Sequence, residues 1–286
     1  MRLGVGLYLD TDDPEEMVRS YVAAGYSAAV CPPVSLEHPE HMRLVREAFE
    51  RWDVQLAEVG VWNNMLDADP EQRAANVQAN ITALTVAEEM GARCCVNIAG
   101  SYHSTCWDGP HQRNLSEEAF DATVENVRRI IDSVRPKTTH YSLETMPWSI
   151  PDSPDSYLRL IQAIDRPAFG VHLDPVNLIN SPARYFDNAG LLRECFAKLG
   201  PWIVSCHAKD ILLREQLTVH LDEVRPGLGE LDYGVYLREL SRLPGDVPLI
   251  LEHLPQEQYP PAQAYLLSVA QQAGVTFQAA TAWPRK

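Results

Sequence analysis

Short runs of mainly hydrophobic residues alternate along this chain with longer segments in which hydrophobic residues recur every three or four positions. The short runs are typical of buried β-strands, because a strand covered on both faces carries few polar side chains. The pattern predicts eight strands, at residues 3–9, 26–31, 54–62, 93–100, 140–146, 168–174, 202–210 and 247–254.

The longer segments predict amphipathic helices. In residues 117–135, Phe120 and Ile131 fall on one face of a helix, and Pro136 ends it because proline cannot continue the hydrogen-bond ladder. An aspartate followed by a proline, as at Asp69, is typical of a helix start. The other helices are expected to begin at Pro14 or to occupy residues 36–51, 71–90, 154–164, 188–199, 233–243 and 260–273.

Eight strands alternating with eight helices in 286 residues favour a (β/α)8 TIM barrel, with residues 1–286 as one domain. The alternative is a doubly wound open sheet, whose first strand is normally followed by a glycine-rich turn. Residues 7–15, LYLDTDDPE, offer no such turn. Residues 226–232, PGLGELD, follow no clear strand, and we interpret them as a turn in which Asp232 caps the next helix rather than as a phosphate-binding loop.

Composition and charge narrow the classes of partner. The net charge of −15 repels phosphate backbones and anionic lipids, so we expect neither a nucleic acid nor a membrane as partner. The six cysteines form no CxxC pair, and we interpret them as buried free thiols in a cytoplasmic protein. No hydrophobic run approaches the length of a membrane span, and the N-terminus lacks the pattern of a signal peptide.

Ionisable residues stand near the C-terminal ends of the last four predicted strands. They are Glu144, Asp174, His207 and Glu252. In a (β/α)8 barrel these strand ends build the active site, and neighbouring strands lie about 4.8 Å apart, so the four side chains can converge. Three carboxylates crowded in a low-dielectric site repel one another unless a cation lies among them. The pattern predicts one divalent ion, for which this ligand set suits Mn²⁺, Co²⁺ or Mg²⁺ and, less distinctively, Zn²⁺.

The same residues lie in runs that resemble a known family. LET at 143–145, HLDPVN at 172–177, CHAKD at 206–210 and LEH at 251–253 are similar to the strand ends of the xylose isomerase-like TIM barrels. This superfamily contains sugar isomerases and epimerases, cyclitol isomerases and dehydratases, and DNA repair enzymes of the endonuclease IV type. The resemblance implies metal ligation by the four residues, a small carbohydrate substrate, and a homodimer or homotetramer. In the epimerases two glutamates exchange protons with opposite sides of the substrate, which implies catalytic roles for Glu144 and Glu252.

Two departures from the family pattern affect the subgroup. Ketose 3-epimerases of this family usually carry a histidine three residues after the aspartate of the sixth strand, where this chain has Asn177. The endonuclease branch needs further histidine and carboxylate ligands and a basic groove, and the net charge of −15 argues against it.

The chemistry open to such a site is proton transfer next to a carbonyl. A metal that polarises a carbonyl and a neighbouring hydroxyl acidifies the C–H between them, and it stabilises the enediolate that a carboxylate base produces. Return of the proton gives a metal-dependent isomerase or epimerase of a sugar, keto-sugar or cyclitol, which is our interpretation. The alternatives are a lyase or dehydratase that acts on a 3-keto-glycoside or inosose, and a non-catalytic carbohydrate-binding barrel that keeps the metal for structure.

Further polar and aromatic residues are candidates for substrate contact. Lys209 either binds a substrate oxyanion or balances the ligand carboxylates, and Asn177 follows the metal-ligand aspartate. Trp62 and Trp107 either stack on a sugar or pack at the rim, and His103 is either a substrate contact or an exposed loop residue.

A second group of residues is predicted to lie beneath the ligands. Glu58 is expected to be a buried acid with a partner, and strand alternation places Ser142 and His172 one layer below the metal. The absence of a convincing phosphate loop favours an unphosphorylated substrate.

Overall fold

Eight parallel strands close into a barrel in the computed structural model, which describes residues 1–281. They are β1 (Arg2–Val5), β2 (Ala28–Val30), β3 (Gln55–Gly60), β4 (Cys94–Asn97), β5 (His140–Glu144), β6 (Phe169–Leu173), β7 (Ile203–Ala208) and β10 (Pro248–Leu251). The order around the barrel is β1, β10, β7, β6, β5, β4, β3, β2, and β2 pairs with β1. The predicted (β/α)8 barrel is therefore confirmed, although each strand is shorter than the hydrophobic run that predicted it.

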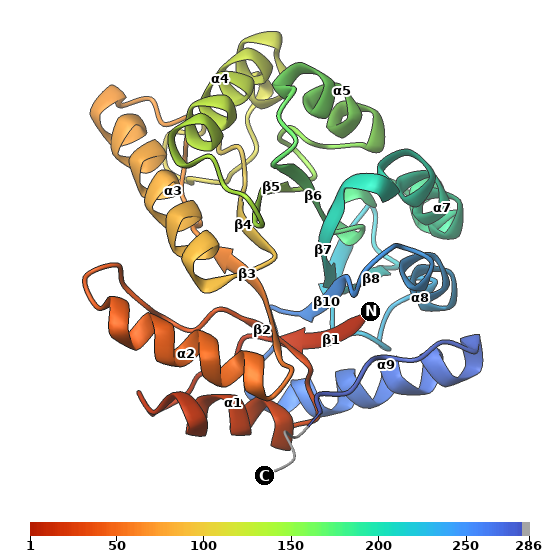
Figure 1. Ribbon diagram of the computed structural model, residues 1–286. Coiled ribbons are helices and arrows are strands. Elements are labelled where there is room, and N and C mark those ends of the chain that lie inside the picture. The colour runs from red at the N-terminus through yellow and green to blue at the C-terminus, as the bar shows by residue number, and fades with distance from the viewer. Residues whose placement is uncertain (282–286) are drawn as a thin grey trace.

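The helices form a ring outside the strands (Figure 1). They are α1 (Pro14–Ala23), α2 (Pro39–Arg51), α3 (Pro70–Met90), α4 (Glu117–Val134), α5 (Pro154–Ile164), α6 (Pro182–Phe186), α7 (Asn188–Leu199), α8 (Tyr233–Ser241) and α9 (Tyr259–Ala273). The Asp69 side chain accepts a hydrogen bond from the backbone N–H of Glu71, as expected for a helix start. Helix α2 begins at Pro39 rather than at residue 36, because proline has no N–H to donate and suits the first helical position.

An antiparallel hairpin that the hydrophobic pattern does not reveal follows β7. It consists of β8 (Asp210–Leu213) and β9 (Leu221–Val224), whereas the sequence predicts a single strand over residues 202–210. The Asp210 carboxylate accepts hydrogen bonds from the backbone N–H groups of Gly227 and Gly229 at 2.9 and 3.1 Å. It accepts two more from the N–H groups of Ile211 and Leu231. Asp210 therefore turns away from the barrel and begins the hairpin instead of ending β7.

This contact explains the glycine-rich segment at residues 226–232. A Cβ at Gly229 would clash with the Ile211 carbonyl oxygen, so only glycine fits there. Asp232 accepts from the Val235 N–H at 2.8 Å and caps α8, which confirms the predicted turn. The N–H groups that a phosphate would need are occupied by Asp210.

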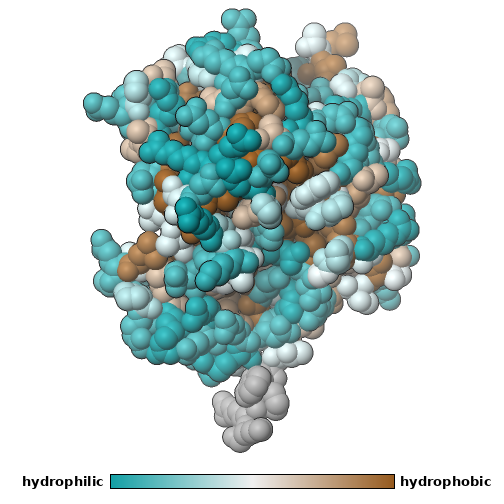
Figure 2. Space-filling model, turned by 45° about the horizontal axis from the view of Figure 1, so that its top comes forward, coloured by the Kyte–Doolittle hydropathy of each residue, from teal (hydrophilic) through white to brown (hydrophobic). Residues whose placement is uncertain are grey.

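The surface and the thiols add two details. Hydrophilic residues cover most of the face drawn in Figure 2, and hydrophobic residues lie between them in smaller patches. All six cysteines are free, and most are buried as predicted, but Cys106 is exposed in the long loop after β4.

Among residues 1–281, none of the helices combines the length and the apolar character needed to cross a membrane.

Tyr157 fixes the ends of β5 and β6, which carry two of the candidate ligands. This fully buried tyrosine of α5 donates its O–H to the Leu143 carbonyl oxygen at 2.6 Å and accepts from the His172 N–H at 3.2 Å. Its hydroxyl therefore joins the backbones of two neighbouring strands directly below Glu144 and Asp174.

We predict that Tyr157→Phe lowers the free energy of unfolding by about 1–3 kcal/mol, because it leaves buried backbone groups without a partner. Urea denaturation measures the change. Tyr8→Phe is the matched control, since Tyr8 is 96% exposed, and it should change stability by less than about 0.5 kcal/mol. Equal effects of the two substitutions would contradict the structural role of the Tyr157 hydroxyl.

Candidate metal centre

The barrel brings the four predicted metal ligands together. Glu144 is the last residue of β5, Asp174 and Glu252 directly follow β6 and β10, and His207 lies in β7. These strands are consecutive in the barrel, and one ligand atom from each residue lies within 4.8 Å of all the others. The cluster is largely buried, with Asp174 and His207 fully buried and 17% of the Glu252 side chain exposed.

Local hydrogen bonds set the orientation of Asp174. Its Oδ1 accepts from the backbone N–H of Val176 at 2.9 Å, in a short 3₁₀ turn (Val176–Leu178) that Pro175 opens. Thr145 accepts from the Asp174 N–H at 3.0 Å and donates to its carbonyl oxygen at 2.7 Å. These contacts leave Oδ2 as the oxygen that faces the cluster.

Asn177 supports the neighbouring ligand rather than standing apart in the loop. Its Nδ2 donates to the Thr145 carbonyl oxygen at 3.0 Å and lies 3.4 Å from Glu144 Oε1. Asn177 therefore helps to orient the Glu144 carboxylate, and it also lines the cavity described below.

His207 points its Nδ1 atom into the carboxylate cluster. This atom lies 2.9 Å from Glu144 Oε1, 2.7 Å from Glu252 Oε1 and 3.9 Å from Asp174 Oδ2. Burial disfavours the charged imidazolium, but Glu252, Glu144 and Glu58 outweigh burial and raise the pKa of His207 well above its ordinary value.

Lys209 supplies the other positive charge. Its side chain is only 3% exposed, and Nζ lies 2.8 Å from Asp174 Oδ2 and 2.5 Å from Glu252 Oε1. Burial opposes the charge of each group, but the ammonium and the carboxylates together raise the pKa of Lys209 and lower the pKa values of Asp174 and Glu252. Lys209 was predicted either to bind a substrate oxyanion or to balance the ligand carboxylates, and these contacts correspond to the second role.

The residues present fit a divalent cation. Without an ion, the carboxylates favour a proton on His207. A divalent ion bound in place of that proton would leave His207 neutral and cancel the excess of two negative charges that three carboxylates and one ammonium leave. Within the described part of the chain, Asp174 Oδ2 and Glu252 Oε1 are buried oxygens that accept no hydrogen bond of good geometry, although Lys209 is near both. Oxygen-rich ligation with one imidazole is the donor set of Mn²⁺, Co²⁺, Mg²⁺ or Zn²⁺ sites.

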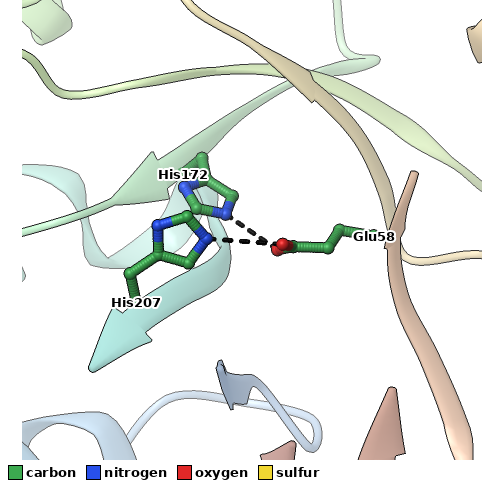
Figure 3. Close-up of side chains that lie close together, drawn as sticks. All are labelled: Glu58, His172 and His207. Atoms are coloured by element: carbon green, nitrogen blue, oxygen red, sulfur yellow. Dashed lines mark hydrogen bonds and ion pairs between the residues drawn. The ribbon is translucent and has the colours of Figure 1, made fainter. Parts of the chain in front are cut away.

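Glu58 lies beneath this cluster and contacts two histidines at once. It comes from β3, across the barrel from His172 of β6 and His207 of β7 (Figure 3). Its Oε2 lies 2.9 Å from His172 Nε2, and its Oε1 lies 3.3 Å from His207 Nε2. Burial alone would raise the pKa of Glu58, but the two histidines outweigh it and hold that pKa well below its usual range.

The predicted layer beneath the ligands is thus largely present. Glu58 is a buried acid with partners, and His172 faces it, but Ser142 instead donates to the Cys95 carbonyl oxygen at 3.2 Å. Sequence reasoning missed Ser205, which donates to Glu58 Oε2 at 3.0 Å. Its position two residues before His207, on the same face of the strand, is the signal that points to it.

Glu58 also determines which nitrogen of His207 carries the proton. An ionised carboxylate only accepts hydrogen bonds, so it requires an N–H at His207 Nε2. In the neutral ring the lone pair then lies on Nδ1, which faces Glu144 and Glu252. Glu58 therefore leaves the lone pair of the neutral His207 ring at Nδ1, where a cation would bind.

A cavity of about 690 Å³ opens above the cluster. Glu144, Glu252, Asn177, Lys209, Trp62 and Trp107 line it. His103 is not among its lining residues, because its Nδ1 accepts from the backbone N–H groups of Thr105 and Cys106 within its own loop. Trp148, which the sequence analysis did not single out, also lines the cavity from the loop after β5.

Sequence comparison independently identifies the family to which this barrel belongs. A family model described as the xylose isomerase-like TIM barrel matches residues 20–269. The chain therefore belongs to the xylose isomerase-like TIM barrel family. No curated protein matches the sequence.

Solved structures share the fold with low sequence identity. Endonuclease IV from Thermus thermophilus aligns with a TM-score of 0.70 and 14% identity, over 95% of this chain and 100% of that one. The 3-keto-D-glucoside 4-epimerase from E. coli gives 0.67 and 14%, over 94% and 99%. A probable 3-DHS dehydratase involved in petrobactin synthesis from Bacillus anthracis gives 0.66 and 16%, over 93% and 97%. At these identities the likeness establishes the fold alone.

We predict that Glu58→Gln weakens the affinity for a divalent ion by about 10–100-fold, because the amide no longer fixes the tautomer of His207. Titration with Mn²⁺ against a fluorescent chelator measures the dissociation constant. Glu125→Gln, which removes an exposed carboxylate on α4, is the control and should leave the constant unchanged. An unchanged constant in the folded Glu58→Gln variant would count against this role.

Proposed function

We propose that this protein is a divalent-metal-dependent isomerase or epimerase of an unphosphorylated sugar, keto-sugar or cyclitol. Glu144, Asp174, His207 and Glu252 would hold one ion, with Mn²⁺, Co²⁺ or Mg²⁺ as the candidates. The observation that carries the proposal is the convergence of these four ligand groups, within 4.8 Å of one another, at the floor of a cavity that opens at the C-terminal end of the barrel. Family membership and the fold shared with an epimerase support it.

The chemistry divides between the ion and the side chains. When bound, the ion would polarise a substrate carbonyl and the adjacent hydroxyl, which acidifies the C–H between them. Glu144 and Glu252 come from the two ends of the ligand series, β5 and β10, and both line the cavity, so they can face a substrate from two sides. One carboxylate removes the proton and the other returns it at the neighbouring carbon or on the opposite face.

Neighbouring groups keep these two carboxylates in position and ionised. Asn177 lies beside Glu144, while Lys209 and His207 lie 2.5 and 2.7 Å from Glu252 Oε1. The Lys209 ammonium beside Glu252 favours the ionised carboxylate, which is the form that accepts a proton. Asp174 and His207 are fully buried and would mainly hold the ion.

We predict that the purified protein contains about one divalent ion per chain and that EDTA abolishes activity and lowers the melting temperature. A ligand that binds only the folded state stabilises it by mass action, so its removal has the opposite effect. Elemental analysis and thermal denaturation provide the measurements. In His207→Ala the metal should be lost first, and excess Mn²⁺ or Co²⁺ should restore part of the activity. Metal-free protein with intact turnover in EDTA would refute the metal requirement.

We predict that Glu144→Gln and Glu252→Gln each lose at least about 10²-fold in kcat, even with the metal site filled, because an amide cannot accept a proton. The assay follows turnover of a carbohydrate panel in deuterium oxide, with metal content checked by elemental analysis. Wild-type protein should incorporate deuterium without loss of water or aglycone.

Each other outcome of this assay has a definite meaning. Loss of water or aglycone would identify a lyase or dehydratase in place of an isomerase. Binding without any turnover across the panel would identify a non-catalytic carbohydrate-binding barrel. If both fully metallated glutamine variants turned over at near wild-type rates, the proton-transfer mechanism would be refuted. An intramolecular hydride shift would then be the better explanation.

A further inference from the structure

Three partly exposed tryptophan side chains line the cavity. Trp62 follows β3, Trp107 lies in the loop after β4, and Trp148 lies in the loop after β5. They are 43%, 42% and 40% exposed, whereas tryptophan is highly buried on average in folded proteins. Three partly exposed indoles around one cavity therefore need an explanation beyond packing.

Trp62 is held in place by a glycine. A Cβ at Gly60 would lie 2.5 Å from Trp62 Nε1 and 3.1 Å from its Cε2, so the indole ring rests directly on the Gly60 backbone. Any larger residue at position 60 would push the ring away. The backbone at the end of β3 thus supports the Trp62 ring and fixes its position in the lining of the cavity.

Trp148 is held by a hydrogen bond from a different loop. Its Nε1 donates to the Asp108 carbonyl oxygen at 2.7 Å, which ties the loop after β5 to the loop after β4. The polar edge of this indole is therefore satisfied within the protein, and its apolar faces are left for other contacts. Two separate devices thus orient two partly exposed rings that line one cavity.

The cavity has room for more than a single sugar ring. Its volume of about 690 Å³ lies well inside the range of about 300–1,000 Å³ that holds drug-sized ligands, which exceed one sugar ring in size. A ring placed at the candidate metal centre occupies the floor and leaves the space beside the tryptophans for a second group.

The charge of the lining disfavours a phosphate as that second group. Among the described residues that line the cavity, the cations are Lys209 and His253. Lys209 already contacts Asp174 and Glu252, and His253 Nδ1 lies 3.1 Å from Glu223 Oε1. A phosphate group would meet only partnered cations and the surrounding carboxylates, so the lining disfavours an anionic second group.

We propose that the substrate is an uncharged glycoside that carries a ketone on its first ring and whose second ring stacks on Trp62 and Trp148. The first sugar ring lies at the candidate metal centre, and this part rests on the proposed function. The second ring has an apolar face, which both an aryl aglycone and a second pyranose provide. The tryptophans thereby form an aglycone subsite.

Calorimetric titration of the Mg²⁺-loaded protein tests the subsite through binding rather than through the products of turnover. The probes are matched sets built on glucose, galactose and mannose, each comprising the free sugar, its phenyl glycoside, a disaccharide and the 6-phosphate. In the set that binds best, a glycoside should bind at least about tenfold more tightly than the free sugar, and the phosphate should bind more weakly. Comparison of the phenyl glycoside with the disaccharide identifies the second ring.

Matched variants then assign the effect to the tryptophans. Trp148→Ala and Gly60→Ala should each remove most of the preference for the glycoside while the affinity for the free sugar stays within about twofold. Trp202→Ala is the control, because Trp202 is 37% exposed but precedes β7 at the opposite end of the barrel. Melting temperature and Mg²⁺ affinity show that each variant is folded.

Two results would overturn the subsite: free sugars that bind as tightly as their glycosides in every set, or a Trp148→Ala variant that weakens both equally. The proposed function fails separately. Glycoside preference without deuterium exchange in any free sugar or 3-keto-glycoside would support the subsite and refute the isomerase. Exchange on free sugars with no glycoside preference would support the isomerase and refute the subsite.

Discussion

The mutual repulsion of Glu144, Asp174 and Glu252 is the constraint on which the rest of this end of the barrel depends. Buried carboxylates this close can remain ionised only if positive charge lies among them. Lys209 supplies part of that charge from the strand end after β7, and the ligand set provides for a divalent ion to supply the remainder. At the end of the barrel where the strands have their C-termini, the arrangement of these side chains is therefore determined by a balance of charge rather than by hydrophobic contact.

The same balance extends downward into the barrel. Interiors of (β/α)8 barrels are usually filled by branched hydrophobic side chains. Here Glu58, His172, Ser205 and His207 form a buried polar layer whose hydrogen bonds join different strands. Because partly satisfied polar groups are costly in a buried site, the layer that orients His207 also fixes the relative positions of β3, β6 and β7.

The fold and the convergence of Glu144, Asp174, His207 and Glu252 could be predicted from the sequence because their signals are local. Strands alternate with helices, Asp69 precedes its proline, and each ligand residue stands at the end of its own hydrophobic run. The long-range contacts could not be predicted in this way. The partners of Glu58 come from strands more than a hundred residues away, Lys209 reveals its role only through distances, and the position of Trp62 depends on the backbone of Gly60. The β8–β9 hairpin was missed because Asp210 resembles the last residue of a strand in the sequence. Only the structure shows that four backbone N–H groups donate to its carboxylate.

The anchoring of Asp210 also has a consequence for how this barrel can diversify. The base of the hairpin is fixed by backbone hydrogen bonds to one carboxylate, directly after Lys209, whereas Leu217 at the tip is 98% exposed. Insertions between β8 and β9 therefore leave the ammonium and its neighbours undisturbed, and a longer tip costs little loop-closure entropy. The hairpin is a position where a new recognition element can be grafted onto an unchanged barrel.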